Sequence, residues 1–283
     1  MASSDHLITT QELATALKTE SSKDIVILDC SWYLPAQKRS AQAEFISSHI
    51  PGASYFDIDA ICDKSSKLPH MLPTAAAFSD AVGNLGISNN SIVIAYDGAG
   101  LFSAARVWWM FHVFNHQNVR ALNGGFPKWV AEDREIEKNI QHRPTCQFIS
   151  NKSDDLIVSM TDMLDICSSK EAVILDARSS ARFQGTAPEP RPELPSGHMP
   201  GAISLPFDQL QSNGLLKPAK ELRAIFNNLG VNGNDQIITT CGSGVTAAII
   251  TLALAEAGFG LHHLYDGAWS EWAVAENTPI ISA

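Results

Sequence analysis

Apolar residues are arranged along this chain in two alternating patterns. Short runs rich in β-branched residues are typical of buried strands, and longer stretches rich in alanine and leucine are typical of helices. The first pattern predicts strands at 24–29, 91–97, 172–178 and 236–240. The second predicts helices at 10–18, at 103–114 and from about 247 to 257, with two more that end near Gly86 and Gly230. Strands that alternate with helices favour an α/β fold whose sheets are mainly parallel and flanked by helices.

The landmarks of the first half of the chain return in the same order in the second half. A strand that ends in a carboxylate, at Asp29 and again at Asp176, is followed by the motif His-x-Pro-Gly-Ala at 49–53 and again at 198–202. The shift between matching positions is nearly constant, which indicates an internal duplication. We therefore expect an N-terminal domain at 1–138, a linker at 139–155 and a C-terminal domain at 156–283.

One predicted strand-loop-helix segment carries a nucleophile. The strand at 236–240 ends at Cys241, and a loop with two glycines leads into the next helix. The glycines let successive backbone N–H groups turn toward one point, where the positive end of the helix dipole also lies. We therefore expect a thiolate whose pKa lies below the free value of roughly 8.5, although a cysteine at a strand end can also be a small buried hydrophobe. The residues expected to hold the reacting sulfur are Gly242, Ser243, Gly244, Val245 and Thr246.

The nucleophile is confined to the second half. The position that matches Cys241 in the first half is Tyr96 or Asp97, depending on where the gap is placed, and neither residue is a thiol. Tryptophan pairs recur as well, and we expect Trp108 and Trp109 to belong to a core rather than to a ligand cage. The second half is therefore the expected catalytic domain.

Composition and charge narrow the possible functions. A net charge of −10 argues against a nucleic-acid partner, but it leaves room for a locally positive pocket that binds a small anion. No apolar run is long enough for a membrane span, and no targeting segment is evident. The five cysteines are odd in number and include no Cys-x-x-Cys pair, which favours a reducing compartment over a disulfide framework or a zinc site. We expect a cytoplasmic location, with a mitochondrial one as the alternative, and neither metal nor cofactor.

Several motifs resemble the two-domain rhodanese family. The repeated His-x-Pro-Gly-Ala motif and a cysteine loop in the second half alone are similar to the family as a whole. The loop CGSGVTA at 241–247, with LPHMLP at 68–73 and GTAPEPR at 185–191, is similar to the 3-mercaptopyruvate sulfurtransferase branch. The resemblance covers the chain from about Thr10 to Pro279 and implies two tandem rhodanese-like domains.

The resemblance implies a two-step transfer of sulfur. The Cys241 thiolate would take the sulfur of 3-mercaptopyruvate, a 2-oxo acid thiol, and leave pyruvate and an enzyme persulfide. A thiol acceptor such as thioredoxin, or cyanide, would then remove that sulfur. A catalytic network is implied at Cys241, Ser243, His70 and Asp59, and substrate binding at Arg182 and Arg191.

The residue types suit this chemistry, and each also has a structural interpretation. Arginine forks bind a 2-oxo acid well, and His70 or Ser243 could donate the proton that the leaving group needs. However, His70 could shape a proline-rich turn, Asp59 could cap a helix, and Ser243 could serve loop geometry. Arg182 could be a surface residue, and Arg191 could pair with a nearby glutamate.

Three other functions remain open at this stage. A phosphatase loop of this kind usually closes with an arginine, and none follows Cys241 within the loop. A thiosulfate sulfurtransferase would favour cationic side chains at positions 242 and 243, where this chain has glycine and serine. A non-catalytic binding module would not need Cys241, although the first repeat could be one.

Overall fold

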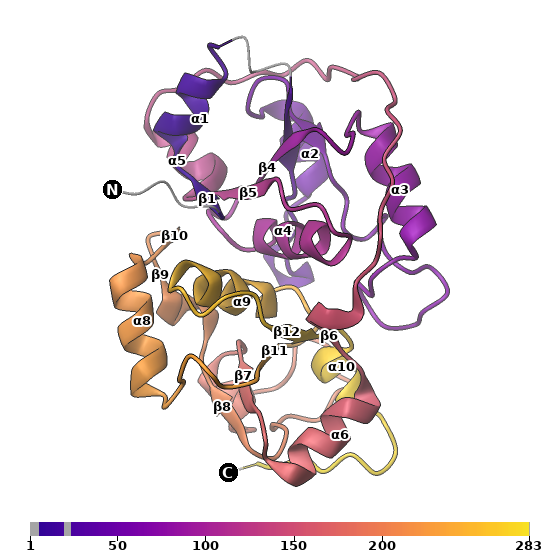
Figure 1. Cartoon of the computed structure of the whole chain (residues 1–283), viewed down its shortest axis with the longest axis vertical. Helices are drawn as coiled ribbons and strands as arrows, with labels where there is room; N and C mark the ends of the chain where they lie inside the picture. The colour runs from indigo at the N-terminus through magenta and orange to yellow at the C-terminus, as the bar shows by residue number, and fades with distance from the viewer. Residues whose placement is uncertain (1–5, 20–23, 283) are drawn as a thin grey trace. The chain divides into compact units, whose positions relative to one another are not determined.

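The chain forms two compact units, which the computed structural model describes over residues 6–19 and 24–282 (Figure 1). The first unit is made of the chain up to Asp63 together with Leu72–Ser153 and Asn213–Leu216. The second is made of Lys64–Met71, Asp154–Ser212 and the chain from Lys217 onward. The polar stretch after Arg134 lies mostly with the first unit, where the Cys146 N–H donates to the Gly83 carbonyl at 2.9 Å.

The first unit is built on a five-stranded parallel sheet. Its strands stand in the order β1 (Leu7–Ile8), β5 (Val119–Leu122), β4 (Ile92–Tyr96), β2 (Ile25–Asp29) and β3 (Ser54–Tyr55). Its helices are α1 (Thr10–Ala16), α2 (Ala41–Ser47), α3 (Ala75–Asn84), α4 (Ala104–Val113) and α5 (Gly125–Ala131). The α1 helix begins where the sequence predicts, because Thr9 and Glu12 form a capping box.

The second unit repeats this plan. Its sheet is also parallel, in the order β6 (Ile157–Val158), β12 (His263–Tyr265), β11 (Ile237–Thr240), β7 (Val173–Asp176) and β8 (Ala202–Ser204). Its helices are α6 (Met160–Ser169), α7 (Ser180–Phe183), α8 (Ala219–Asn228), α9 (Ala247–Glu256) and α10 (Ala268–Trp272). The second unit also contains the short strand Gln211–Ser212 (β9) and 3-10 turns at Asp154–Leu156 and Phe207–Leu210. The short strand Leu215–Leu216 (β10) and the 3-10 turn Pro35–Gln37 belong to the first unit.

Strand register confirms the duplication and settles its alignment. Tyr96 at the end of β4 pairs with Asp29, and Thr240 at the end of β11 pairs with Asp176. The next residues, Asp97 and Cys241, therefore stand at the same place in the two units. The α/β fold with parallel sheets flanked by helices, expected from the sequence, is confirmed.

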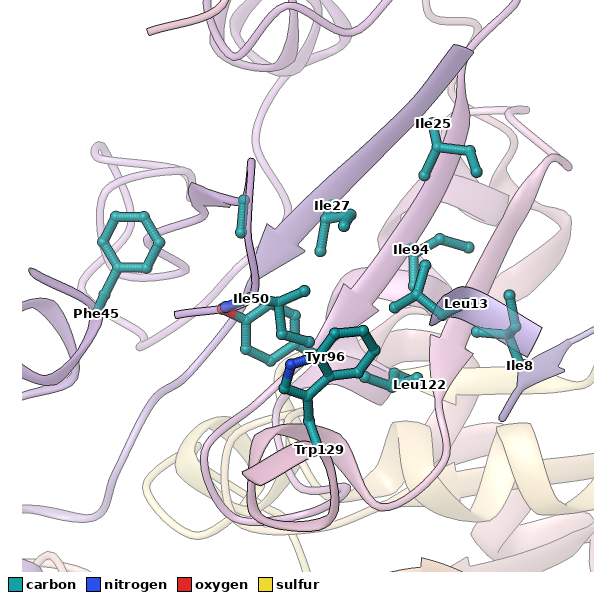
Figure 2. Packing of buried hydrophobic residues seen from close by; sticks show 11 residues of the cluster. Ile8, Leu13, Ile25, Ile27, Phe45, Ile50, Ile94, Tyr96, Leu122 and Trp129 are labelled. Atoms are coloured by element: carbon teal, nitrogen blue, oxygen red, sulfur yellow. The ribbon is translucent and has the colours of Figure 1, made fainter. Parts of the chain in front are cut away.

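Each unit has its own hydrophobic core. In the first, aliphatic side chains of β2 and β4 pack with residues of α1 and with Trp129 of α5 (Figure 2). The helices that follow the central strands are buried on nearly every side: all of α4 is buried, and so is α9 from Ala247 to Ala255. A helix that is apolar all round is a core element. Trp108 and Trp109 of α4 are fully buried, as expected for core residues.

The repeated histidine of the His-x-Pro-Gly-Ala motif serves the fold. His49 stacks on Phe45 with ring centroids 4.3 Å apart, and its Nδ1 lies 2.7 Å from the Phe45 carbonyl. His198 stacks in the same way on Phe183, at 3.9 Å, with Nδ1 2.8 Å from the Phe183 carbonyl. Two histidines with matching local partners in both units are structural, so they are poor candidates for catalysis.

We expect a buried histidine to make the first unit sensitive to acid. Burial lowers the pKa of His112 on α4 from 6.5 to about 4, although a hydrogen bond with Gln117 opposes the shift. The unfolded chain therefore takes up a proton in the window between those two values while the folded chain does not. We expect the free energy of unfolding to fall by roughly 2 kcal/mol between pH 7 and pH 5 on account of this group.

Urea unfolding of the wild type and of His112→Leu at both pH values tests this sensitivity to acid. The variant is expected to lose less stability on acidification than the wild type. Equal losses in the two proteins would contradict the assignment of the acid sensitivity to His112.

Across residues 6–19 and 24–282, no helix is long and apolar enough to cross a membrane.

Candidate active site

Cys241 stands directly after the central strand of the second sheet. β11 is flanked by β7 and β12, and all four of its residues are buried. The carboxyl ends of parallel strands are where open α/β sheets bind ligands. Gly244 in the following loop has φ +76°, a left-handed conformation that glycine adopts without strain. Cys241 is 2% exposed, so the thiol is buried and not on an open surface.

The start of α10 fixes the cysteine loop from outside. The Trp269 N–H donates to the Cys241 carbonyl at 2.9 Å. Ser270 donates twice to the Gly242 carbonyl, from its N–H at 3.0 Å and from its hydroxyl at 2.6 Å. These three bonds hold the two peptide groups on either side of Gly242, so the backbone that follows the nucleophile is fixed.

The first unit shows what such a loop binds. Asp97 takes the place of Cys241, and its carbonyl accepts from the Phe126 N–H at 3.0 Å just as the Cys241 carbonyl accepts from Trp269. Its carboxylate accepts four backbone N–H bonds from the loop and the beginning of α4. The donors are Ala99 at 2.9 Å, Phe102 at 2.6 Å, Ser103 at 2.9 Å and Ala104 at 2.9 Å. At this place in the fold, a turn followed by a helix start therefore forms a site for an anion.

Arg182 of α7 lies against the cysteine loop. Its Nε donates to Glu189 Oε2 at 3.1 Å and its Nη2 makes an ion pair with the same oxygen. A side-chain carbon added at Gly242 would lie 2.9 Å from Arg182 Nη2, so glycine at this position leaves the room that the guanidinium occupies. The Arg182 side chain is 21% exposed and can reach a ligand from solvent.

A second, fully buried arginine stands behind the first. Arg178 pairs with Asp176 at the end of β7 at 2.7 Å and with Glu189 Oε1 at 2.9 Å. Its guanidinium also lies 4.1 Å from the ring centre of Trp269. Burial opposes the charged form of Arg178, but the two carboxylates outweigh it and raise the pKa of the guanidinium above its usual range.

Arg191 approaches the loop through Ser270. Its Nη1 lies 3.4 Å from the Ser270 hydroxyl, which itself donates to the Gly242 carbonyl. The pairing of Arg191 with a nearby glutamate, left open by the sequence, is not what the structure shows for this side chain. Arg182 makes that pairing instead, with Glu189. Both arginines proposed for substrate binding thus have contacts at Gly242 or with a residue bonded to it.

Of the remaining expected site residues, Ser243, Thr246 and His70 belong to the second unit, whereas Asp59 belongs to the first. Ser243 is buried in the cysteine loop, and Thr246 is the N-cap of α9. His70 is buried, has a left-handed backbone with φ 61°, and lies in the segment Lys64–Met71, which belongs to the same unit as Cys241. Asp59 is exposed in the first unit and accepts a hydrogen bond from Trp32 Nε1 at 2.9 Å. Its place in a catalytic network stays a prediction.

Sequence reasoning missed part of this arrangement. Glu189 stands in the GTAPEPR segment that carries the resemblance, yet its bridge between two arginines could not be read from the segment. Arg178 stands two residues after Asp176, the carboxylate at the end of β7, and that spacing was the available signal for a buried ion pair. Within the described part of the chain, no group of three or more His, Cys, Asp or Glu residues is placed to hold a metal ion.

Comparison with protein families agrees with the two repeats. The model of the rhodanese-like domain matches residues 9–132 and again residues 159–275. The chain belongs to the rhodanese family. Each match covers four of the five strands of one parallel sheet, and the second contains Cys241.

Rhodanese-family relatives are similar over nearly the whole chain. A 3-mercaptopyruvate sulfurtransferase of Escherichia coli K12 is 42% identical over 258 residues, which cover 91% of this chain and 92% of the relative. The mouse 3-mercaptopyruvate sulfurtransferase is 40% identical over 270 residues, covering 94% and 91%. The crystal structure of SseA from Escherichia coli, titled as a study of 3-mercaptopyruvate sulfotransferases, is 39% identical, covers 94% of this chain and 99% of its own, and has a TM-score of 0.84.

Proposed function

We propose that this chain is a 3-mercaptopyruvate sulfurtransferase that carries the sulfur as a persulfide on Cys241. The observation that carries the proposal is the place of Cys241, where the other unit seats a carboxylate on four N–H donors. A donor cage of that kind suits the thiolate before transfer and the anionic persulfide after it. Relatives with this activity in their names, 37–42% identical over more than nine tenths of the chain, support the proposal.

The reaction divides into two balanced steps. In the first, the Cys241 thiolate attacks the sulfur of 3-mercaptopyruvate, an S–S bond forms, and the C–S bond breaks. The electron pair of the broken bond stays on the three-carbon fragment as the enolate of pyruvate, which takes a proton. In the second, an acceptor thiolate attacks the outer sulfur of the persulfide and releases the Cys241 thiolate for another cycle.

The two arginines supply positive charge at the cysteine loop of a protein whose net charge is −10. Arg182 lies at Gly242 and Arg191 lies beside Ser270, so both approach the loop that carries the nucleophile. Planar guanidinium groups bind the carboxylate and the carbonyl of a 2-oxo acid through paired hydrogen bonds. Anchoring of that end of the donor places its sulfur at Cys241, and fixing two reactants in this way lowers the barrier.

The enolate needs a proton donor, and we assign His70 or Ser243 to that role. Ser243 is two residues from the nucleophile and buried. His70 is buried in the segment that belongs to the catalytic unit. Imidazole and hydroxyl groups both transfer protons over hydrogen-bond distances, and we keep Asp59 as a proposed member of the same network.

Replacement of Arg191 by lysine tests donor binding. Arg191→Lys keeps the charge but loses the planar fork, so we expect KM for 3-mercaptopyruvate to rise by about tenfold, equivalent to 1–2 kcal/mol for a charged hydrogen bond. Steady-state kinetics measures the change. Arg223→Lys on α8, an exposed arginine whose Nε donates to the Ala257 carbonyl, is the matched control and should leave KM unchanged.

Two results would argue against this account of the donor. An unchanged KM in Arg191→Lys would mean that Arg191 does not contact the donor. A higher kcat/KM with thiosulfate than with 3-mercaptopyruvate would favour the alternative function, thiosulfate sulfurtransferase by the same persulfide. Arg182 occupies the space beside Gly242, and the loop itself has no cationic side chain at positions 242 and 243. This arrangement favours 3-mercaptopyruvate over thiosulfate as the sulfur donor.

We propose a reduced thiol protein such as thioredoxin as the acceptor and the cytoplasm as the compartment. All five cysteines are free thiols, as a reducing compartment maintains them. An Arabidopsis relative, 39% identical, is named as mitochondrial, and that compartment is the alternative.

A further inference from the structure

Glu189 is the centre of a network of ion pairs that extends from Asp176 at the end of β7 to Arg182 at the cysteine loop. Its side chain is almost fully buried, at 1% exposure, between two arginines. Oε1 accepts from Arg178 Nη1 at 2.9 Å, and Oε2 accepts from Arg182 Nε at 3.1 Å and pairs with Arg182 Nη2. One carboxylate thus fixes a core arginine and a loop-facing arginine at the same time.

At the core end of this ion-pair network, several contacts hold the Arg178 guanidinium in place. Asp176 Oδ2 binds Arg178 Nη2 at 2.7 Å, and the Gly197 carbonyl accepts from the same nitrogen at 2.7 Å. Trp269 covers the guanidinium face at 4.1 Å. Arg178 is therefore an anchor whose position is set by the end of β7, and it in turn fixes Glu189.

At the other end of this ion-pair network, Arg182 lies at the cysteine loop. Glu189 occupies the edge of the Arg182 guanidinium formed by Nε and Nη2. The other edge, Nη1–Nη2, can form a paired bond to a second carboxylate, and Nη2 lies against Gly242 beside the nucleophile. Moving Glu189 would therefore move the arginine that approaches the donor.

We propose that Glu189 is a positioning residue that holds Arg182 against the Gly242 backbone so that the Nη1–Nη2 edge of Arg182 meets the anionic end of the sulfur donor. This inference rests on the proposed function, because it assigns Arg182 to donor binding. Glu189 itself acts through Arg182 and does not touch the donor. The same arrangement makes Gly242 a steric requirement, since a side chain there would displace the Arg182 guanidinium.

Glu189→Asp separates position from charge. Aspartate keeps the negative charge but is one methylene shorter, so it cannot reach Arg178 and Arg182 together. We expect KM for 3-mercaptopyruvate to rise by about tenfold while kcat stays within about threefold, as for loss of one charged hydrogen bond in binding. Glu193→Asp, an exposed glutamate in the same segment, is the matched control and should leave both constants unchanged.

Coupling to Arg182 distinguishes positioning from a general structural role. In an Arg182→Ala background, Glu189→Asp should raise KM by less than about twofold, because the residue that it positions is gone. A tenfold rise in both backgrounds would overturn the proposal, since it would show that Glu189 acts independently of Arg182. An unchanged KM in the single variant would overturn it as well.

Alkylation of Cys241 keeps this test separate from the identity of the donor. Iodoacetate carries a carboxylate and iodoacetamide does not. The rate of alkylation of Cys241 by iodoacetate divided by the rate with iodoacetamide, measured on the Cys241 peptide by mass spectrometry, therefore reports how strongly Arg182 attracts a carboxylate to the loop. We expect Glu189→Asp and Arg182→Ala to lower this ratio by a similar factor. If the wild type does not turn over 3-mercaptopyruvate but Glu189→Asp still lowers the ratio, the proposed donor is refuted and the role of Glu189 stands. If the ratio in Glu189→Asp equals that of the wild type, the role of Glu189 is refuted.

Discussion

Replacement of Cys241 by serine is expected to abolish sulfur transfer while leaving the fold intact. Serine is nearly isosteric with cysteine and fits the same buried position, but its hydroxyl is not ionised and forms no persulfide. Turnover with 3-mercaptopyruvate and a thiol acceptor should fall below detection. Circular dichroism and thermal unfolding should match the wild type.

The other four cysteines provide the control. Burial raises the pKa of Cys167 to about 11, and burial raises the pKa of Cys30 well above its usual value, so neither is a ready thiolate at neutral pH. Cys30→Ala and Cys167→Ala, combined with Cys62→Ser and Cys146→Ser, should retain most of the activity. Activity that survives in Cys241→Ser, or disappears in the fourfold variant although it remains folded, would contradict the mechanism.

Replacement of Asp97 by alanine is expected to destabilise the first unit strongly. Its carboxylate, 1% exposed, accepts four backbone N–H bonds, and alanine would leave those donors without it. Removal of a buried, charged acceptor should lower the free energy of unfolding by roughly 4 kcal/mol. Trp108 and Trp109 lie in the core of the same unit and allow its unfolding in urea to be followed by fluorescence.

Asp97→Asn is the matched control for the role of charge. The asparagine has the same shape and keeps one oxygen, which can serve the three donors that now share Oδ2, namely Phe102, Ser103 and Ala104. We expect about half of the destabilisation seen with alanine, because the charge and the bond from the Ala99 N–H are lost. A wild-type unfolding midpoint in Asp97→Ala would show that the loop does not depend on a bound anion.

Much of the fold could be predicted because local patterns and the duplication agree. The strands and helices that were predicted lie within a few residues of the observed ones: β4, for example, covers Ile92–Tyr96 within the predicted 91–97. The central strands β2, β4, β7 and β11 are short runs rich in β-branched residues, and each repeat supports the interpretation of the other. The cysteine loop was predictable for the same reason, since a strand, two glycines and a helix follow one another in the sequence.

The partners of individual side chains could not be predicted, because they depend on contacts between distant elements. Whether Tyr96 or Asp97 matches Cys241 depended on a gap that strand register alone decides. Glu189 reaches two arginines only once α7 and the end of β7 are placed. The family resemblance implied one network for His70 and Cys241, but residue patterns alone could not show that the segment with His70 belongs to the unit of Cys241, since that segment lies far from Cys241 along the chain.

The mass of the Cys241 peptide after reaction with the donor tests the central claim most directly. The protein is incubated with 3-mercaptopyruvate in the absence of an acceptor thiol, digested, and analysed by mass spectrometry. The account predicts that the peptide with Cys241 gains the mass of one sulfur atom, that pyruvate appears in equal amount, and that a thiol acceptor restores the original mass. Pyruvate formation with no added sulfur on Cys241, or with the sulfur on another cysteine, would contradict it.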